Sequence, residues 1–219
     1  LSNVSEPLIG VVNTAVIGQL KEPYYIGAIA VGALIFSFIF WGFGFLRMST
    51  GGLSAQALGA GEGAKVTIVE YASATCPHCA AFHKDVWPKL KTDYIDTGKI
   101  RFIFREFPLN DPALAAFMIA RAAPKESYFP LIGVFFDTLE TWAKDPANGL
   151  LNIAKQAGFT QEKFDATLKD EKLAKGIMEI RDGGVKFGVQ GTPTFFLNGK
   201  PMRGEVTYDS LKADIDKLL

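Results

Sequence analysis

Two cysteines separated by two residues are the side chains of this sequence best suited to chemistry. They are the two cysteines that the chain contains, Cys76 and Cys79, with Pro77 and His78 between them. Thiols at this spacing close a small ring when they form a disulfide, and one such close pair does not brace a fold. The pair therefore predicts reversible thiol–disulfide chemistry.

The two thiols are expected to differ in reactivity because they occupy different places on one helix. If Cys76 caps the helix N-terminus, unpaired N–H groups and the helix dipole lower its pKa, and the thiolate is the reactive species. Cys79 lies one turn inside the helix, where shielding suits a resolving role, and His78 adds a donor or positive charge near Cys76. Stabilising the thiolate stabilises the reduced pair, so the disulfide becomes a stronger oxidant.

A Cys-x-x-Cys pair is also half of many zinc sites. His78 and His83 are the further ligands that could be considered. His78 and Cys79 are adjacent and cannot easily share one tetrahedral ion on a helix, and the sequence has no second cysteine pair. We therefore expect neither a metal nor another cofactor.

A second signal is the Thr192-Pro193 step ahead of a short apolar strand. A cis peptide bond here would pack against the dithiol, and an ordinary trans proline at a strand start is the alternative. A proline offers no N–H, and the backbone of the preceding residue is left free to pair with an extended substrate chain. Thr192 and Pro193 are therefore candidate substrate-binding residues.

Glu70 lies six residues before Cys76 in a predicted strand. Since side chains alternate along a strand, either Glu70 or Tyr71 faces inward. A buried Glu70 beneath the dithiol would move protons to or from Cys79, whereas an outward Glu70 would be a solvated strand-edge acid. Both orientations are compatible with the pattern.

The elements around these residues follow from periodicity. Alternating, β-branched residues predict strands at 66–71 and 100–107, joined by a helix from 76 to about 97. Asp111 and Pro112 supply an N-cap and a first-turn proline for a helical block that reaches about residue 187. Breaks in this block are expected at three places. These are Pro124, residues 146–149 and Gly158.

The C-terminal part completes the pattern with a short strand at 194–197, a turn at Asn198-Gly199, a returning strand at 200–204 and a helix at 207–219. Strand, helix, strand, helical block, hairpin and helix make an α/β thioredoxin fold with a helical insertion at about 111–187. The long separation between Cys79 and Pro193 requires that insertion.

The chain is divided by composition near residue 60. Its 219 residues carry no net charge, which gives no indication of nucleic-acid binding. Residues 1–50 are predicted to be an apolar helical segment, residues 51–64 a linker rich in glycine and alanine, and residues 65–219 the redox domain. Residues 24–46 are uncharged, and a helix of this length, about 35 Å, would cross a membrane.

Three N-terminal stretches resemble the first two helices of the DinF branch of the MATE multidrug exporters. They are residues 1–8, 13–18 and 41–48, so the resemblance covers roughly residues 1–60. It implies helices of a membrane transporter. However, Asn13 stands where many relatives carry an acidic residue implicated in cation coupling, and two helices do not make a pore. No transport activity is inferred.

Residues 65–219 resemble the DsbA family, most closely its alphaproteobacterial DsbA-like branch. The matching motifs are Glu70, Cys76-Pro77-His78-Cys79, residues 101–107, residues 150–164 and residues 191–200. By this resemblance Cys76 is the nucleophile, Cys79 the resolving thiol and His78 the thiolate stabiliser. Thr192 and Pro193 form the cis-proline loop, and Glu70 is the buried acid.

The sequence departs from the family at two points. Ala122 and Ala166 look like the vacant positions of a second, structural cysteine pair that some relatives carry. His83 stands where some members have another acid, which changes the expected proton path.

The resemblance implies a dithiol oxidase that introduces disulfides into secreted or periplasmic proteins. Its partners would be reduced protein substrates and a quinone-linked membrane reoxidase, with no nucleic acid. The implied location is periplasmic, with membrane attachment through the N-terminal segment; Lys21 and Arg47 flank residues 24–46 almost symmetrically, so the positive-inside rule does not fix the orientation. The alternatives are a disulfide reductase or isomerase, and a non-catalytic, membrane-tethered fragment of a transporter.

Overall fold

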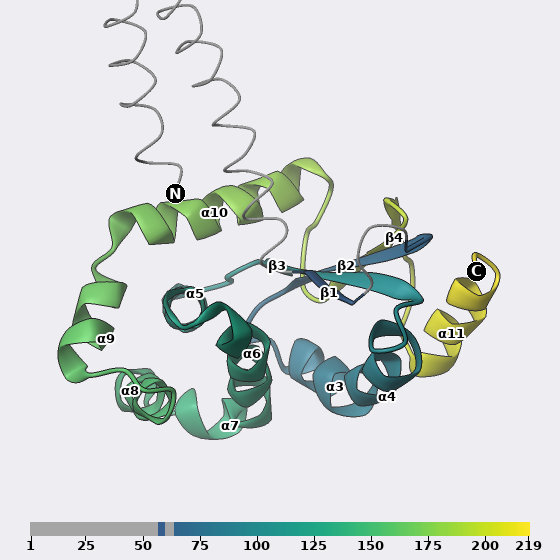
Figure 1. Cartoon of the computed structure of the whole chain (residues 1–219). Coiled ribbons are helices and arrows are strands. Elements are labelled where there is room, and N and C mark those ends of the chain that lie inside the picture. The colour runs from purple at the N-terminus through teal and green to yellow at the C-terminus, as the bar shows by residue number, and fades with distance from the viewer. Residues whose placement is uncertain (1–56, 60–63) are drawn as a thin grey trace, which may run out of the picture. The chain divides into compact units, whose positions relative to one another are not determined.

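A five-stranded sheet lies at the centre of the part of the chain that the computed structural model describes, residues 57–59 and 64–219 (Figure 1). The strands are β1 (Ala57–Gly59), β2 (Val66–Ala72), β3 (Ile100–Glu106), β4 (Thr194–Leu197) and β5 (Lys200–Pro201). Their order across the sheet is β1-β3-β2-β4-β5. β2 pairs with β3 in parallel and with β4 antiparallel. The central strand is therefore the one that leads into the cysteine motif.

Residues 76 to 97 do not form the single helix that the sequence predicts. The segment contains α3 (Pro77–Asp85), α4 (Trp87–Leu90) and a π-helical turn, η1 (Lys91–Ile95). The helix is interrupted at Val86, whose φ is −109°. Pro88 explains the break, because it has no N–H to donate to the carbonyl four residues earlier. The interruption leaves α3 as a short helix that is capped by Cys76 and contains Cys79.

The helical insertion lies where the sequence predicts it. It consists of α5 (Asp111–Ala122), η2 (Lys125–Ser127), α6 (Tyr128–Asp137), α7 (Leu139–Trp142), α8 (Pro146–Gln156), α9 (Gln161–Leu168) and α10 (Glu171–Lys186). The cap of α5 is Asn110 rather than Asp111, since the Asn110 side chain accepts from the Ala113 N–H at 3.0 Å.

The break predicted at residues 146–149 is wrong, because these residues begin α8. Asp145 caps the helix and Pro146 occupies its first turn, where a missing N–H costs nothing. Gly149 lies inside this helix. A glycine is needed there because a Cβ would come within 2.7 Å of the Trp142 backbone. The glycine thus permits close approach of α8 to α7 rather than ending a helix.

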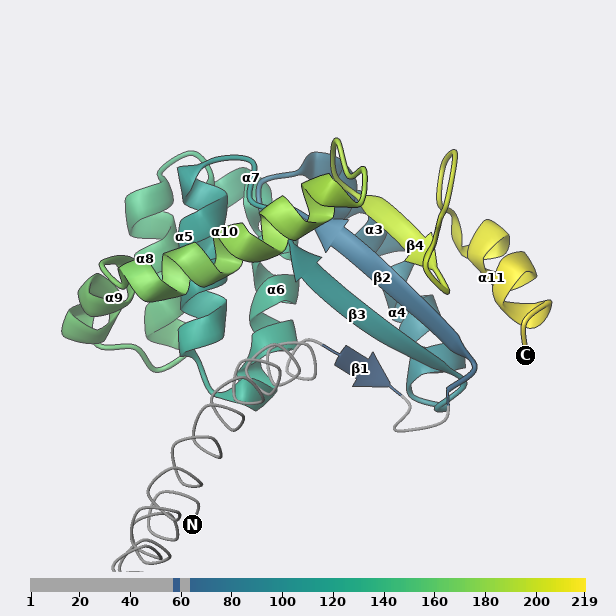
Figure 2. The ribbon, with the colours of Figure 1, turned by 90° about the horizontal axis from the view of Figure 1, so that it is seen from above.

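The two faces of the sheet are covered by different helices. α3 and α4 lie on one face, and α10 crosses the other (Figures 1 and 2). On the α10 face, Tyr71 packs edge-on against Phe107 and Phe196, and Gly184 of α10 leaves room for the Tyr71 ring. Because side chains alternate along β2, Glu70 points to the opposite face, toward α3.

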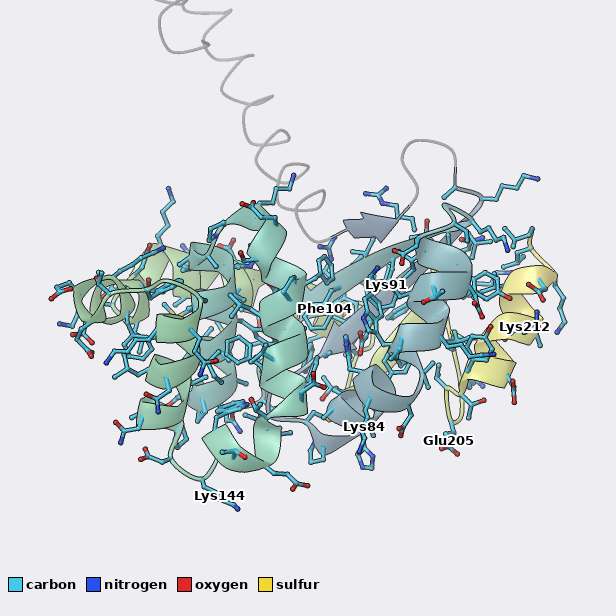
Figure 3. The ribbon with its side chains drawn as sticks, turned by 60° about the horizontal axis from the view of Figure 1, so that its bottom comes forward. Lys84, Lys91, Phe104, Lys144, Glu205 and Lys212 are labelled. Carbon is cyan, nitrogen blue, oxygen red and sulfur yellow. The ribbon has the colours of Figure 1, made fainter. Side chains whose placement is uncertain are left out.

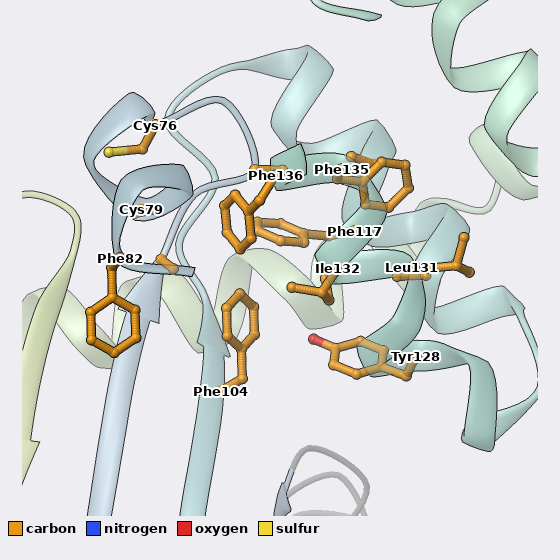
Figure 4. Packing of buried hydrophobic residues seen from close by; sticks show 14 of the residues in the cluster. Cys76, Cys79, Phe82, Phe104, Phe117, Tyr128, Leu131, Ile132, Phe135 and Phe136 are labelled. Atoms are coloured by element: carbon orange, nitrogen blue, oxygen red, sulfur yellow. The ribbon is translucent and has the colours of Figure 1, made fainter. Parts of the chain in front are cut away.

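An aromatic core joins the sheet to the helical insertion (Figure 4). Phe104 of β3 lies edge-on to Phe117 of α5, Tyr128 and Phe136 of α6. Phe104 is fully buried, whereas Lys84, Lys144 and Lys212 are exposed at the surface (Figure 3).

A buried carboxylate fastens the end of β3 to the same insertion. Glu106 accepts both Nε and Nη2 hydrogen bonds from Arg121 of α5, at 2.6 and 3.0 Å. It also accepts the Tyr128 hydroxyl of α6 at 2.7 Å. The fork-shaped guanidinium matches the carboxylate, as buried charges require. The contacts hold the insertion in place beside the edge of the sheet where the cysteine motif begins.

The chain after β4 follows the prediction with shorter elements. Asn198 and Gly199 have positive φ values of 46° and 78°, which suit the two-residue hairpin turn between β4 and β5. β5 ends at Pro201 instead of residue 204, and the Met202 N–H still donates to the Phe195 carbonyl of β4 at 2.9 Å. The final helix, α11 (Tyr208–Asp216), begins at a capping box formed by Thr207 and Ser210.

The domain begins earlier than the sequence predicts. β1 lies within residues 51–64, which were expected to be a linker, and it pairs antiparallel with β3. The Ala-Leu-Gly segment has little strand propensity of its own, but β3 offers it an unpaired edge. The apolar segment at 1–50, its membrane helix at 24–46 and the exporter resemblance lie outside the described residues. In residues 57–59 and 64–219, no helix combines the length and apolar character needed to span a membrane.

Candidate active site

Cys76 lies at the junction between β2 and α3, as the N-cap of the helix. Its backbone N–H donates to the Ser73 carbonyl at 3.0 Å, and its carbonyl accepts the Ala80 N–H at 3.1 Å. A turn at the end of β2 therefore fixes the cysteine at the helix start. Pro77 in the first turn of α3 suits this place, because the first N–H groups of a helix have no intrahelical partner.

The two thiols lie at different depths. Cys79 is completely buried, whereas 5 % of Cys76 remains accessible. Figure 4 shows Cys76 at the rim of the helix and Cys79 beneath it. Both are free thiols, so the structure describes the reduced pair. This difference in access agrees with a nucleophile at Cys76 and a resolving thiol at Cys79.

The surroundings of Cys76 favour its thiolate. A hydrogen bond from the Cys79 thiol lowers the pKa of Cys76 to about 5, against the opposing effect of burial. The Thr192 side chain and the backbone N–H groups of Cys79 and His78 lower it further. Hydrogen bonds to the charged form depress an acidic pKa, and the Thr192 hydroxyl, which is buried and has no hydrogen-bond partner in the part of the chain described, is available to donate one. Cys76 is therefore largely ionised at neutral pH.

The surroundings of Cys79 favour its thiol. Burial is the main cause that raises the pKa of Cys79, followed by the hydrogen bond that it gives to Cys76. The negative charges of Glu70 and the Cys76 thiolate raise this pKa further. The two sulfurs thus share one proton unequally, with the proton on the buried one.

His78 and Pro77 are exposed on the surface of α3. The contribution of His78 to the lowered pKa of Cys76 comes through its backbone N–H. Stabilisation of the thiolate by the His78 imidazole remains a prediction from the sequence.

The loop before β4 lies against the nucleophile, although it is more than a hundred residues away in the chain. The Cys76 sulfur lies 3.2 Å from the Thr192 carbonyl oxygen, and the Thr192–Pro193 peptide bond is cis. The Thr194 hydroxyl donates to the Gly191 carbonyl at 2.7 Å and closes the loop. The structure thus brings together the two motifs that the sequence singled out.

Glu70 is buried, which decides between its two expected orientations. None of its surface is exposed, and its Oε2 lies 3.0 Å from Nε2 of His83. Its Oε1 is buried and has no hydrogen-bond partner in the part of the chain described. A carboxylate held in this way needs a partner, since an isolated buried charge is costly.

His83 is the site residue that the sequence interpretation missed as a partner of Glu70. It follows Cys79 by four residues, so the two side chains lie on the same face of α3. This spacing is the feature of the sequence that could have placed His83 beneath the dithiol. In residues 57–59 and 64–219 no group of three or more His, Cys, Asp or Glu side chains is arranged to hold a metal ion.

The lowered pKa of Cys76 predicts how the stability of the reduced protein depends on pH. At pH values between the folded pKa of Cys76, about 5, and its ordinary pKa of 9.0, Cys76 is a thiolate in the folded protein and a thiol in the unfolded chain. The stabilisation is complete above pH 9 and disappears as the pH falls toward 5, by a few kcal/mol in total. Cys79 does not contribute below pH 9, because it is protonated in both states.

Urea unfolding of the reduced wild type and of Cys76→Ser, repeated at several pH values, measures this effect. We expect the difference in free energy of unfolding between them to increase with pH. A difference that stays constant from pH 5 to 9 would contradict the thiolate assignment.

Comparison with known proteins places this geometry in a family. Residues 56–217 match the Thioredoxin family. A Rickettsia bellii protein is 33 % identical over 159 residues, which are 71 % of this chain and 61 % of the relative, so the chain spans about three fifths of that protein. Disulfide bond formation protein D of Bacillus subtilis is 30 % identical over 169 residues, which are 72 % of this chain and 74 % of the relative.

Solved structures give the same result. Alpha-DsbA1 of Wolbachia pipientis superposes with a TM-score of 0.69 at 31 % identity, covering 74 % of this chain and 89 % of that one. BdbD of Bacillus subtilis superposes with a TM-score of 0.65 at 26 % identity, covering 74 % and 91 %. The chain therefore belongs to the thioredoxin family, among its DsbA-like disulfide oxidoreductases.

Proposed function

We propose that the domain is a dithiol oxidase, which transfers the Cys76–Cys79 disulfide to pairs of thiols in other proteins. The observation that carries the proposal is the placement of the two thiols, with Cys76 as the N-cap of α3 beside the Thr192 carbonyl and Cys79 completely buried. This placement lowers the pKa of Cys76 to about 5 and raises the pKa of Cys79. A stabilised thiolate favours the reduced pair over the disulfide, so the disulfide is a strong oxidant.

The reaction proceeds by two exchanges. A substrate thiolate attacks Cys76 Sγ, the Cys76–Cys79 bond breaks, and Cys79 leaves with the electron pair and takes up one proton. A second substrate thiolate then attacks the substrate sulfur of the mixed disulfide, and Cys76 leaves as a stabilised thiolate. The substrate loses two electrons and two protons; the enzyme gains both electrons and one proton, and the other proton goes to solvent.

The loop at Thr192 supports substrate binding beside the reacting sulfur. Its carbonyl oxygen lies 3.2 Å from the Cys76 sulfur, so a substrate backbone that pairs with this loop would bring its cysteine within reach of Cys76. We propose reduced, extended protein segments as substrates. Pairing through the backbone accepts many sequences, which suits an oxidase with many clients.

Relatives named for disulfide bond formation support an oxidising compartment such as the periplasm as the place of action. Disulfides persist there and are rare where thiols are kept reduced. Reoxidation of the Cys76–Cys79 pair requires an acceptor of two electrons. We propose a membrane oxidase linked to quinone, which would receive the Cys76 thiolate at a disulfide of its own.

Mixing the oxidised protein with a reduced two-cysteine peptide tests the proposal. We expect one peptide disulfide for each enzyme disulfide consumed, measured by mass spectrometry after thiol blocking. Rapid insulin reduction together with poor peptide oxidation would instead indicate a reductase, and rearrangement of a wrongly paired disulfide protein without net oxidation would indicate an isomerase.

A further inference from the structure

Beneath the dithiol, Glu70 and His83 form a buried acid–base pair. Glu70 Oε2 and His83 Nε2 are 3.0 Å apart, and the two side chains expose 0 % and 5 % of their surface. The charge of Glu70 acts on the buried thiol, since it contributes to the raised pKa of Cys79. The carboxylate therefore lies within electrostatic reach of Cys79 and in contact with His83.

Four aromatic side chains also pack against the His83 ring. Phe136 of α6 lies 4.4 Å from it and Trp87 of α4 lies 5.2 Å from it, between ring centroids. Phe104 of β3 and Phe82 of α3 approach edge-on. Among the described residues, the ion pair of the ring is with Glu70 of β2, and its ring contacts are with aromatic side chains of α3, α4, α6 and β3. The surroundings thus direct the ring to one ionisable partner.

The chemistry of the site requires a route for one proton. Cys79 takes up a proton when the disulfide opens and must lose it before the disulfide can form again. Its sulfur is completely buried, and so is Glu70. A carboxyl group without solvent access can exchange a proton with Cys79 only if another group restores its own protonation state. His83 contacts Glu70 and retains a small accessible surface.

We propose that His83 carries protons between Glu70 and solvent during thiol–disulfide exchange at Cys79. When the disulfide forms, the Cys79 proton passes to Glu70, His83 Nε2 accepts it, and the imidazole releases a proton from its other nitrogen. When the disulfide opens, the same steps run in reverse. His83 acts through Glu70 and is a positioning residue. The inference rests on the proposed exchange reaction at Cys76 and Cys79.

A purely structural pair would make a different prediction. If His83 only fills the space between Phe136 and Trp87, its replacement would change stability without slowing the steps that move the Cys79 proton. The test therefore has to separate the attack by Cys76, which needs no proton from Cys79, from the attack by Cys79.

Reaction of the reduced protein with an aromatic disulfide reagent separates the two steps, because each attack releases one coloured thiolate. Cys76 attacks the reagent first, and Cys79 then attacks Cys76 Sγ after losing its proton. In His83→Gln, which keeps an amide near Glu70 but cannot relay a proton, we expect an unchanged first release. We expect the second release to be about 100-fold slower at neutral pH, the scale of general acid–base catalysis, and to recover as the pH rises.

Two further variants complete the test. Trp87→Phe alters the wall of the same site and keeps His83 and Glu70, so both releases should remain at the wild-type rates. In His83→Ala, imidazole added to the buffer should accelerate the second release. A second release at the wild-type rate in His83→Gln would overturn the inference. Failure of the wild type to oxidise a dithiol peptide, with both releases intact, would instead overturn the proposed function.

Discussion

We expect Cys76→Ser to lose disulfide transfer almost completely, with a rate at least about 10³-fold below that of the wild type, because covalent catalysis ends with its nucleophile. The serine hydroxyl cannot form the mixed disulfide through which electrons leave the substrate. Cys79 cannot replace the lost thiol, since it is buried and its pKa is raised. Oxidation of a reduced two-cysteine peptide, followed by mass spectrometry, measures the loss.

Lys84→Gln provides the control for this variant. Lys84 is exposed on the same helix and is not one of the groups that lower the pKa of Cys76. The variant should retain peptide oxidation at the wild-type rate. Peptide oxidation by a folded Cys76→Ser protein, checked by circular dichroism, would disprove the assignment of Cys76 as the nucleophile.

The second large effect concerns Cys79, whose thiol hydrogen bond is the first cause of the lowered pKa of Cys76. In Cys79→Ala this donor is absent, so we expect the pKa of Cys76 to rise well above its value of about 5. In Cys79→Ser a hydroxyl takes the place of the thiol and remains able to donate, so the rise should be smaller. The pH dependence of alkylation at Cys76 measures both values.

Both Cys79 variants should also accumulate covalent complexes when they are mixed with a peptide that contains a disulfide. The Cys76 thiolate attacks that disulfide and releases one peptide thiolate, and no Cys79 thiol is present to displace the peptide that stays bound. Non-reducing electrophoresis detects these complexes. An alkylation profile that is the same in Cys79→Ala and the wild type would show that the helix N-terminus and Thr192, rather than Cys79, hold the thiolate.

The fold was predictable from sequence as far as local patterns reach. The alternating residues of β2 and β3, the cysteine motif between them and the Asn198-Gly199 turn each specify their own structure, and their order identifies the thioredoxin fold with its insertion. The helix boundaries that were predicted wrongly have local causes. Pro88 interrupts the first helix, and Pro146 begins a helix where a break was expected, because the effect of a proline depends on its place in the turn.

The site was less predictable, because its contacts join residues that are distant in the chain. The sequence singled out Cys76, Cys79 and the Thr192 loop, and the structure places the loop carbonyl on the Cys76 sulfur. The sequence left the orientation of Glu70 open, because the alternation of side chains along β2 places Glu70 and Tyr71 on opposite faces without saying which face is buried. His83 as the partner of Glu70 depends on how α3 packs on β2.

The hydrogen bonds of Glu106 in the scaffold could not be predicted from the sequence either. Its carboxylate binds Arg121 and Tyr128 from two different helices, and no spacing along the chain relates the three residues. Strand β1 is a similar case, because its three residues form a strand through pairing with β3 and not through their own propensity. Partners of this kind emerge only from the folded arrangement.

The reduction potential of the Cys76–Cys79 pair is the most direct test of the account, because it measures how strongly the environment favours the reduced form. It is obtained by equilibrating the protein with glutathione buffers and counting free thiols. A pair with a stabilised Cys76 thiolate should have a potential less negative than about −200 mV, on the oxidising side of the glutaredoxins. A value near −270 mV, that of thioredoxin, would contradict the oxidase and indicate a reductase.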